Sequence, residues 1–328
     1  MGLIFAEAAS PSSTQTMMHP IDTAQTDIQR HQFGRVTVFR GAKGGKYPDG
    51  NQIMIRGSDT LAVLDTPIVA NHIGDEFDAA ELVVMGHVHE DHMAGLHRLP
   101  DAPVFAHLSD LAALQSWEGL VATLGWADPA QADIMRSKLE SEFFYAPRPD
   151  ARGYEDGAVW YLGQSQIRAI HMPGHTAGHS VLLIEPEGVA FIGDIDLTGF
   201  GPYYGDACSC LADFRRSLAR LPEIEARVWV TSHHKGIYTE REVFLRDLKR
   251  FAAVIDERGA RILEWLAQRP MTIAQMVEQR LLYPPGFDAP WVQGAEARSI
   301  SQHLDELLAA GEILQQRNAR GDDLYLRA

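Results

Sequence analysis

The sequence predicts an α/β fold with a small helical domain at its C-terminal end. Short apolar runs bounded by turn residues recur from about residue 36 to residue 231, and such runs are typical of buried strands. Helical patterns lie between several of these runs, as in mixed α/β proteins. From about residue 240 the strand-like runs give way to amphipathic helices. We therefore expect an N-terminal extension at 1–30, a main domain at 31–252 and a winged-helix-like domain at 253–328.

Apolar runs and turn residues place the elements of the main domain. Strands are expected at 36–39, 51–66 (two strands about a turn at 57–59), 81–85, 102–107, 166–197 (three strands, the last two a hairpin) and 227–231. The glycine-rich stretch GAKGGKYPDG at 41–50 indicates a loop. Helices are expected within 109–146, with a start signal at Asp128-Pro129, over 211–221, and from about His92.

The C-terminal segment shows three helical patterns followed by a hairpin pattern, an arrangement typical of winged-helix domains. The helices are expected at 256–268, 272–279 and 295–310, and the hairpin is expected to turn near Arg320-Gly321. Thr272 and Gln275 have the spacing of a capping box at the start of the second helix.

The charge of the third helix indicates whether this domain binds nucleic acid. This helix carries Glu296, Asp305 and Glu306 against Arg298, whereas a helix that binds nucleic acid is usually basic. We therefore expect the domain to pack on the main domain or to form a homodimer contact.

Composition excludes several classes of function. The formal net charge of −15 argues against a nucleic-acid partner and against an anionic membrane surface. No apolar run approaches the roughly 20 residues that span a bilayer, and the N-terminus has no leading positive charge, so we expect neither a membrane segment nor a signal peptide. Cys208 and Cys210 are the two cysteines, and they are too close for an unstrained disulfide. We therefore expect free thiols and a cytoplasmic protein.

A polar cluster follows the apolar strand at 81–85. The stretch GHVHEDHMAGL places three histidines and two acids within six residues. His87, His89 and Asp91 alternate, so they can reach one point from the same side of an extended loop, and His92 turns the other way. Burying several ionisable groups without a ligand is costly, and four donors on so short a loop can serve two adjacent metal ions.

Further donors follow other predicted strands, where α/β scaffolds place their sites. They are His175 and His179 in MPGHTAGH, Asp194 and Asp196 in FIGDID, and His233 and His234 in TSHHKG. A lone histidine at a strand end is more often structural, and His72, His97, His107 and His171 are interpreted in that way. The repeated pattern nevertheless predicts a metal site.

These motifs together resemble the metallo-β-lactamase fold superfamily. HVHEDH, PGHTAGH, FIGDID, TSHHKG and the strand-end Asp65 in LAVLDT occur in that family's order between about 35 and 236. The resemblance implies an αββα sandwich with two metal ions at one edge. It implies one ion held by His87, His89 and His175, a second held by Asp91, His92 and a last histidine, and Asp194 as the bridge. We prefer His233 for the last ligand and leave His234 open.

The resemblance also implies roles for supporting residues. Asp65 is expected to orient a ligating imidazole by accepting its other ring N–H, and His179 to brace the loop that carries His175. The donors are nitrogen and oxygen atoms, a set that suits Zn²⁺ but also Fe or Mn. Two such ions lower the pKa of a shared water, and the resulting hydroxide attacks a carbonyl or phosphoryl centre. Asp91 is expected to accept a hydrogen bond from this nucleophile.

The substrate is expected to be a small molecule. Tyr203 and Tyr204 follow Asp194 closely, and either phenol can line the pocket and donate to the oxyanion or the leaving group, although both can also simply pack. The resemblance to glyoxalase II and to acyl-homoserine lactonases implies hydrolysis of a thioester, lactone or ester. Two alternatives within the family are a phosphodiesterase or ribonuclease, and an iron-dependent redox enzyme such as a sulfur dioxygenase.

Overall fold

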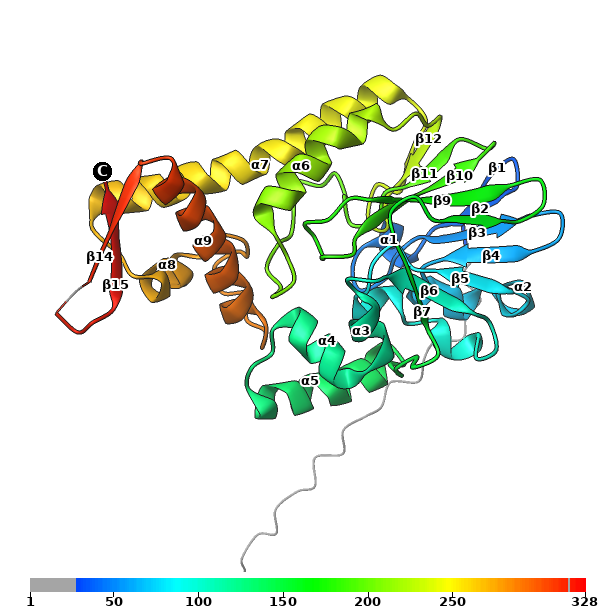
Figure 1. Ribbon diagram of the computed structural model, residues 1–328, viewed down its shortest axis with the longest axis horizontal. Coiled ribbons are helices and arrows are strands. Elements are labelled where there is room, and N and C mark those ends of the chain that lie inside the picture. The colour runs from blue at the N-terminus through cyan, green and yellow to red at the C-terminus, as the bar shows by residue number, and fades with distance from the viewer. Residues whose placement is uncertain (1–27, 318) are drawn as a thin grey trace, which may run out of the picture.

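The computed structural model describes residues 28–317 and 319–328 (Figure 1). The predicted extension at 1–30 lies almost entirely outside these residues. Two large sheets dominate the main domain. The first sheet contains, in spatial order, β1 (Arg30–Phe33), β2 (Val36–Phe39), β3 (Gln52–Arg56), β4 (Leu61–Leu64), β5 (Leu82–Val84), β6 (Val104–His107) and β7 (Arg152–Tyr154). The second contains β13 (Ile237–Tyr238), β12 (Val228–Val230), β11 (Val189–Phe191), β10 (Ser180–Glu185), β9 (Gln166–His171) and β8 (Val159–Tyr161).

The two sheets pack face to face because their strands alternate between two apolar faces. In β3, Ile53 and Ile55 point into the core between the sheets, whereas Met54 points to the outer core beneath the helices. In β10, Leu182 lies in the central core and Leu183 in the outer one. Each sheet therefore buries both faces, and helices cover the two outer faces in an αββα arrangement (Figure 1), as the resemblance implied.

The helices over the first sheet are α2 (Asp75–Asp78), α3 (Leu111–Gln115), α4 (Trp117–Leu124) and α5 (Pro129–Glu142), and α6 (Leu211–Arg220) lies over the second. Asp128 caps α5 by accepting a hydrogen bond from the backbone N–H of Ala130, as its position predicts. The helix expected from His92 is instead the single 3₁₀ turn η2 (Glu90–His92). Thr66 provides the reason, because its backbone N–H and its hydroxyl both donate to the carbonyl of His92.

The two-residue strand β13 was not predicted. Strands β1, β7 and β8 were not predicted either. They are edge or near-edge strands of three or four residues, and many of their side chains are exposed, so they lack the apolar alternation that identifies a strand. Pairing with the neighbouring strand determines their conformation.

Helix α7 (Arg241–Gln268) is longer than predicted and crosses the predicted domain boundary at 252/253. Its first half contributes Phe244 and Phe251 to the outer core of the second sheet. Its second half contributes Ile262 and Leu266 to the core of the C-terminal part. The predicted boundary at 252/253 therefore lies inside a helix that both units share.

The C-terminal part contains the other two predicted helices and the hairpin: α8 (Ile273–Gln279), α9 (Val292–Ala309), β14 (Ile313–Arg317) and β15 (Asp323–Arg327). The capping box of Thr272 and Gln275 is present. Among the described residues, no helix is both long and apolar enough to cross a bilayer.

Two charged residues of α9 make internal contacts. Glu296 is fully buried and accepts hydrogen bonds from three successive backbone N–H groups, 281–283. Arg298 donates to the carbonyls of Leu124, Gly125 and Gly205 in the main domain. The C-terminal part therefore packs on the main domain, as one of the two expectations had it.

Candidate metal centre

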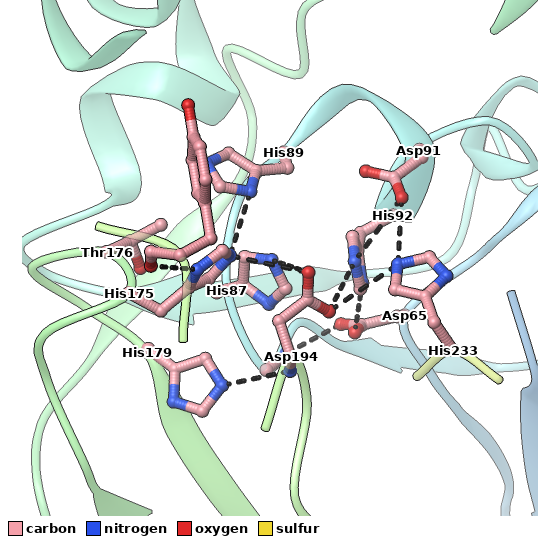
Figure 2. Close-up of polar contacts among 12 residues, drawn as sticks. Asp65, His87, His89, Asp91, His92, His175, Thr176, His179, Asp194 and His233 are labelled. Atoms are coloured by element: carbon pink, nitrogen blue, oxygen red, sulfur yellow. Dashed lines mark hydrogen bonds and ion pairs between the residues drawn. The ribbon is translucent and has the colours of Figure 1, made fainter. Parts of the chain in front are cut away.

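The predicted ligands converge at one edge of the sandwich because each follows a strand that ends there (Figure 2). His87, His89, Asp91 and His92 follow β5, His175 lies on the loop between β9 and β10, Asp194 follows β11, and His233 follows β12. Strands β4 and β5 are parallel, as are β11 and β12, so their carboxyl ends lie on the same side.

The first group of donors consists of His87, His89, His175 and Asp194, with one donor atom from each within 4.8 Å of the others. His175 Nε2 lies 3.1 Å from His89 Nδ1 and 3.4 Å from Asp194 Oδ2. His87 Nε2 lies 3.9 Å from the same carboxylate oxygen.

The second group consists of Asp91, His92 and His233. His233 Nε2 lies 3.0 Å from Asp91 Oδ2 and 3.6 Å from Asp194 Oδ1, and His92 Nε2 lies 3.1 Å from Asp194 Oδ1. One oxygen of Asp194 therefore faces each group, which is the arrangement that a bridging carboxylate requires.

The chemistry of the donors fits two metal ions. Neither ring nitrogen of His87 has a hydrogen-bond partner among the described residues, although both atoms are buried. Buried polar atoms are rarely left without a partner, because that costs about 1–3 kcal/mol each. Coordination to a cation would satisfy them.

Burial and neighbouring charges shift the pKa values of the site's histidines in opposite directions. Burial lowers the pKa of His175 to about 4, so this imidazole is neutral and ready to ligate. Burial also acts to lower the pKa of His233, but Asp194 and Asp91 outweigh it and raise this pKa to about 10. Since a ligating histidine must be neutral, a cation would replace the proton on His233.

Two predicted supporting residues lie beside the site, but the His179 contact with Asp194 differs from the one that was expected. Asp65 Oδ2 lies 2.7 Å from His92 Nδ1, and its other oxygen accepts from the backbone N–H of Gly86, so the carboxylate fixes the His92 ring with Nε2 toward the site. His179 Nε2 accepts from the backbone N–H of Asp194, so this residue braces the turn that carries Asp194.

The structure distinguishes His233 from His234. His233 Nδ1 donates to the carbonyl of Asp49 at 2.7 Å, which directs Nε2 to Asp91. His234 adopts a left-handed backbone with φ 51° and belongs to neither donor group. The geometry therefore favours His233 as the last ligand.

The glycine-rich stretch 41–50 has a role that the sequence did not reveal. It lies directly behind His233, and a Cβ on Gly50 would approach the Ser232 carbonyl to 3.2 Å. Gly45 has φ +72°, and a Cβ there would lie 2.6 Å from Asn51. Glycine thus lets this loop pack closely enough for its carbonyls to hold the His233 ring.

The expectation that Tyr204 lines the pocket needs correction. Its side chain is fully buried, and its hydroxyl lies 2.7 Å from His303 Nε2 on α9. Tyr204 therefore fixes the C-terminal part to the main domain. Tyr203 does lie beside the site, since its ring is 5.9 Å from that of His175 and its carbonyl accepts from His175 Nδ1.

Asp206 is a residue of the site that the sequence analysis missed. Its Oδ2 lies 3.0 Å from His89 Nε2, and its Oδ1 accepts a hydrogen bond from the Tyr203 hydroxyl. Burial would lower the pKa of His89, but Asp206 raises it to about 9. This carboxylate lies in an irregular segment with no preceding strand, so neither periodicity nor spacing marked it.

Replacing Asp206 with asparagine is expected to weaken metal affinity by about 10- to 100-fold, the usual effect of removing a carboxylate that orients a ligating histidine. Competition with a chelator of known affinity measures this change. Asp133→Asn, at an exposed position on α5, is the matched control and should leave the affinity unchanged. Equal affinities for Asp206→Asn and the control would show that Asp206 does not orient His89.

A family model described as the Metallo-beta-lactamase superfamily matches residues 82–254. These residues carry all of the predicted ligands. The match does not extend to α8, α9 or the hairpin.

Three similar proteins extend this finding. The chain is 29% identical over 203 residues to the acyl-coenzyme A thioesterase MBLAC2 of Gallus gallus, covering 55% of this chain and 70% of that protein. It is 24% identical over 235 residues to a hydroxyacylglutathione hydrolase of Maricaulis maris, covering 67% and 87%. A crystal structure of a beta-lactamase domain protein from Burkholderia ambifaria superimposes with a TM-score of 0.66 at 21% identity, covering 91% of this chain and 93% of that chain, and supports the fold alone.

Proposed function

Because this chain belongs to the metallo-β-lactamase superfamily and is a hydrolase of that family, we propose that it uses two divalent metal ions to hydrolyse a small thioester, lactone or ester. The observation that carries the proposal is the pair of donor groups that share Asp194. Among the three substrate classes, thioesters are favoured. The similar proteins named above are a thioesterase and a hydroxyacylglutathione hydrolase.

The donor set favours Zn²⁺, with Fe or Mn as the alternatives, because it consists of imidazole and carboxylate groups without a thiolate. His87, His89 and His175 would hold one ion and Asp91, His92 and His233 the other, with Asp194 between them. When bound, such a pair lowers the pKa of a water and polarises the carbonyl that is attacked.

Two acidic residues have separate tasks in this scheme. Burial would raise the pKa of Asp91, but His92 and His233 lower it overall, so Asp91 stays ionised and can accept a hydrogen bond from the attacking water. Asp206 engages the Tyr203 hydroxyl, so that hydroxyl is already committed as a donor. We therefore assign Tyr203 to the wall of the pocket and not to proton transfer.

The remaining expectations stand as proposals. The C-terminal helices and hairpin form a winged-helix-like packing module, and a homodimer contact on it is compatible with its position. Cys208 and Cys210 are free, which is compatible with a cytoplasmic protein. A small molecule remains the proposed partner, because the net charge disfavours nucleic acid.

The test is metal quantification on the purified protein, followed by a substrate panel under the metal found. We expect about two ions per chain, and hydrolysis of a glutathione or coenzyme A thioester that chelation abolishes and Zn²⁺ restores. The panel also contains an acyl-homoserine lactone, a phosphodiester and single-stranded RNA. Stoichiometric iron with oxygen consumption, or cleavage of RNA in preference to every ester, would contradict the proposal.

A further inference from the structure

We propose that Phe200, Tyr283 and Phe287 form an aromatic wall, contributed by both domains, that binds the apolar acyl group of the substrate. This inference rests on the proposed function and specifies which part of the thioester the chain recognises beyond the reacting carbonyl. Phe200 belongs to the main domain, and Tyr283 and Phe287 lie between α8 and α9.

The three rings form a continuous row. Tyr283 lies between the other two, with ring centroids 5.8 Å from Phe200 and 5.2 Å from Phe287, the latter pair stacked at 14°. Phe200 and Phe287 remain 41% and 42% exposed although each packs against the Tyr283 ring. Their exposed ring surface is available to contact an apolar ligand.

The aromatic wall is continuous with the metal centre. Phe200 lies three residues before Tyr203 on one segment, and Arg258 fixes that segment by donating to the carbonyls of Phe200 and Pro202. Tyr203 in turn donates to Asp206, whose other oxygen lies against His89. Tyr203 and Asp206 therefore connect the segment of Phe200 to the predicted ligand His89, so an acyl group that extends from the reacting centre along this segment meets the wall.

The wall is held in place before any substrate binds. Glu296, buried on α9, accepts hydrogen bonds from the backbone N–H groups of 281–283, at 3.0 Å in the case of Tyr283. Arg258 on α7 donates to the carbonyl of Phe200 at 2.6 Å, and its guanidinium lies 5.6 Å from the Phe200 ring centroid. A surface that is already ordered loses less entropy when it binds a ligand.

Charge indicates which half of the thioester faces the wall. Asp206 lies beside Tyr203, and Asp288 adjoins Phe287 in sequence, and both acids disfavour an anionic group there. The Arg258 guanidinium beside Phe200 already donates to the carbonyls of Phe200 and Pro202. On the side of His233, the glycine-rich loop carries the exposed cations Lys43 and Lys46. The apolar acyl group therefore faces the wall, and a polar or anionic thiol faces the loop.

The experiment compares Tyr283→Ala and Phe287→Ala with Tyr161→Ala, which removes a 75% exposed tyrosine from the edge strand β8. Each metal-loaded variant is assayed with an acetyl and a decanoyl thioester of the same thiol. Binding of decanoate is measured separately by calorimetry. We expect a rise of about tenfold in KM for the decanoyl thioester and in Kd for decanoate in the wall variants, the effect of losing one buried ring contact. KM for the acetyl thioester should change less than twofold.

The two measurements separate this inference from the proposed function. Decanoate that binds the wild type and Tyr161→Ala but not Phe287→Ala would support the wall even if no thioester were hydrolysed. Hydrolysis with the same acetyl-to-decanoyl ratio in all variants would overturn it. Dissociation of a dimer by Phe287→Ala, with unchanged decanoate binding, would likewise overturn it and assign the row to a subunit contact.

Discussion

Replacing Asp194 with alanine is expected to lower kcat/KM for the true substrate by about a thousandfold or more. The carboxylate faces both donor groups, with Oδ1 near His92 and Oδ2 near His175, so its loss affects both predicted ions at once. The charge stabilisation that an ion provides in the transition state is worth several kcal/mol, and each 1.4 kcal/mol corresponds to about a tenfold change in rate. Steady-state kinetics with metal analysis of the same preparation measures the effect.

Asp213→Ala provides the control for this variant, because Asp213 is a carboxylate on α6 paired with Arg216 and away from both groups. It should retain wild-type metal content and activity. An Asp194→Ala protein that keeps two ions and loses less than about tenfold in kcat/KM would show that the carboxylate is not a bridge.

His233→Ala and His234→Ala form a matched pair with very different expected outcomes. His233→Ala removes a side chain that contacts Asp91 and Asp194, and we expect loss of about one ion per chain with a fall in kcat/KM of at least about a hundredfold. His234→Ala should change kcat/KM by less than about threefold, because this side chain belongs to neither donor group. Elemental analysis and kinetics on both proteins measure the difference.

Two results would contradict this assignment. If His234→Ala were the inactive variant, the ligand would be His234 and the loop would rearrange when metal binds. If both variants kept two ions, the second donor group would not hold a metal at all. A circular dichroism spectrum of each variant excludes a folding defect as the cause.

The predicted ligands could be located in the sequence because each follows a strand, and the apolar run of a strand can be recognised from neighbouring residues alone. The end of β5 is visible in the sequence as the change from the apolar Val84 and Met85 to the polar cluster. In FIGDID, the change from apolar residues to Asp194 marks the end of another strand in the same way. The local patterns placed the donors at strand ends, and the resemblance to the metallo-β-lactamase superfamily implied which of them share an ion.

The residues that support the ligands could not be predicted in the same way. Asp206 contacts His89 from a segment without regular structure, and the carbonyl of Asp49 reaches His233 across more than 180 residues of chain. The role of Glu296 could not be predicted either, because the sequence does not show that three backbone N–H groups lie within its reach. Such contacts depend on how the elements pack and leave no periodic trace.

Helix α7 has a consequence for any attempt to divide this protein. Its two halves are embedded in different hydrophobic interiors, with Phe251 in one and Ile262 in the other. Cutting the chain at the predicted boundary, 252/253, would expose apolar side chains of α7 in each fragment. The C-terminal unit therefore cannot be separated from the main domain at that position. Exchanging this unit between related proteins would require transfer of the whole helix Arg241–Gln268. The second sheet of the recipient protein would also need an outer face that packs against the first half of this helix.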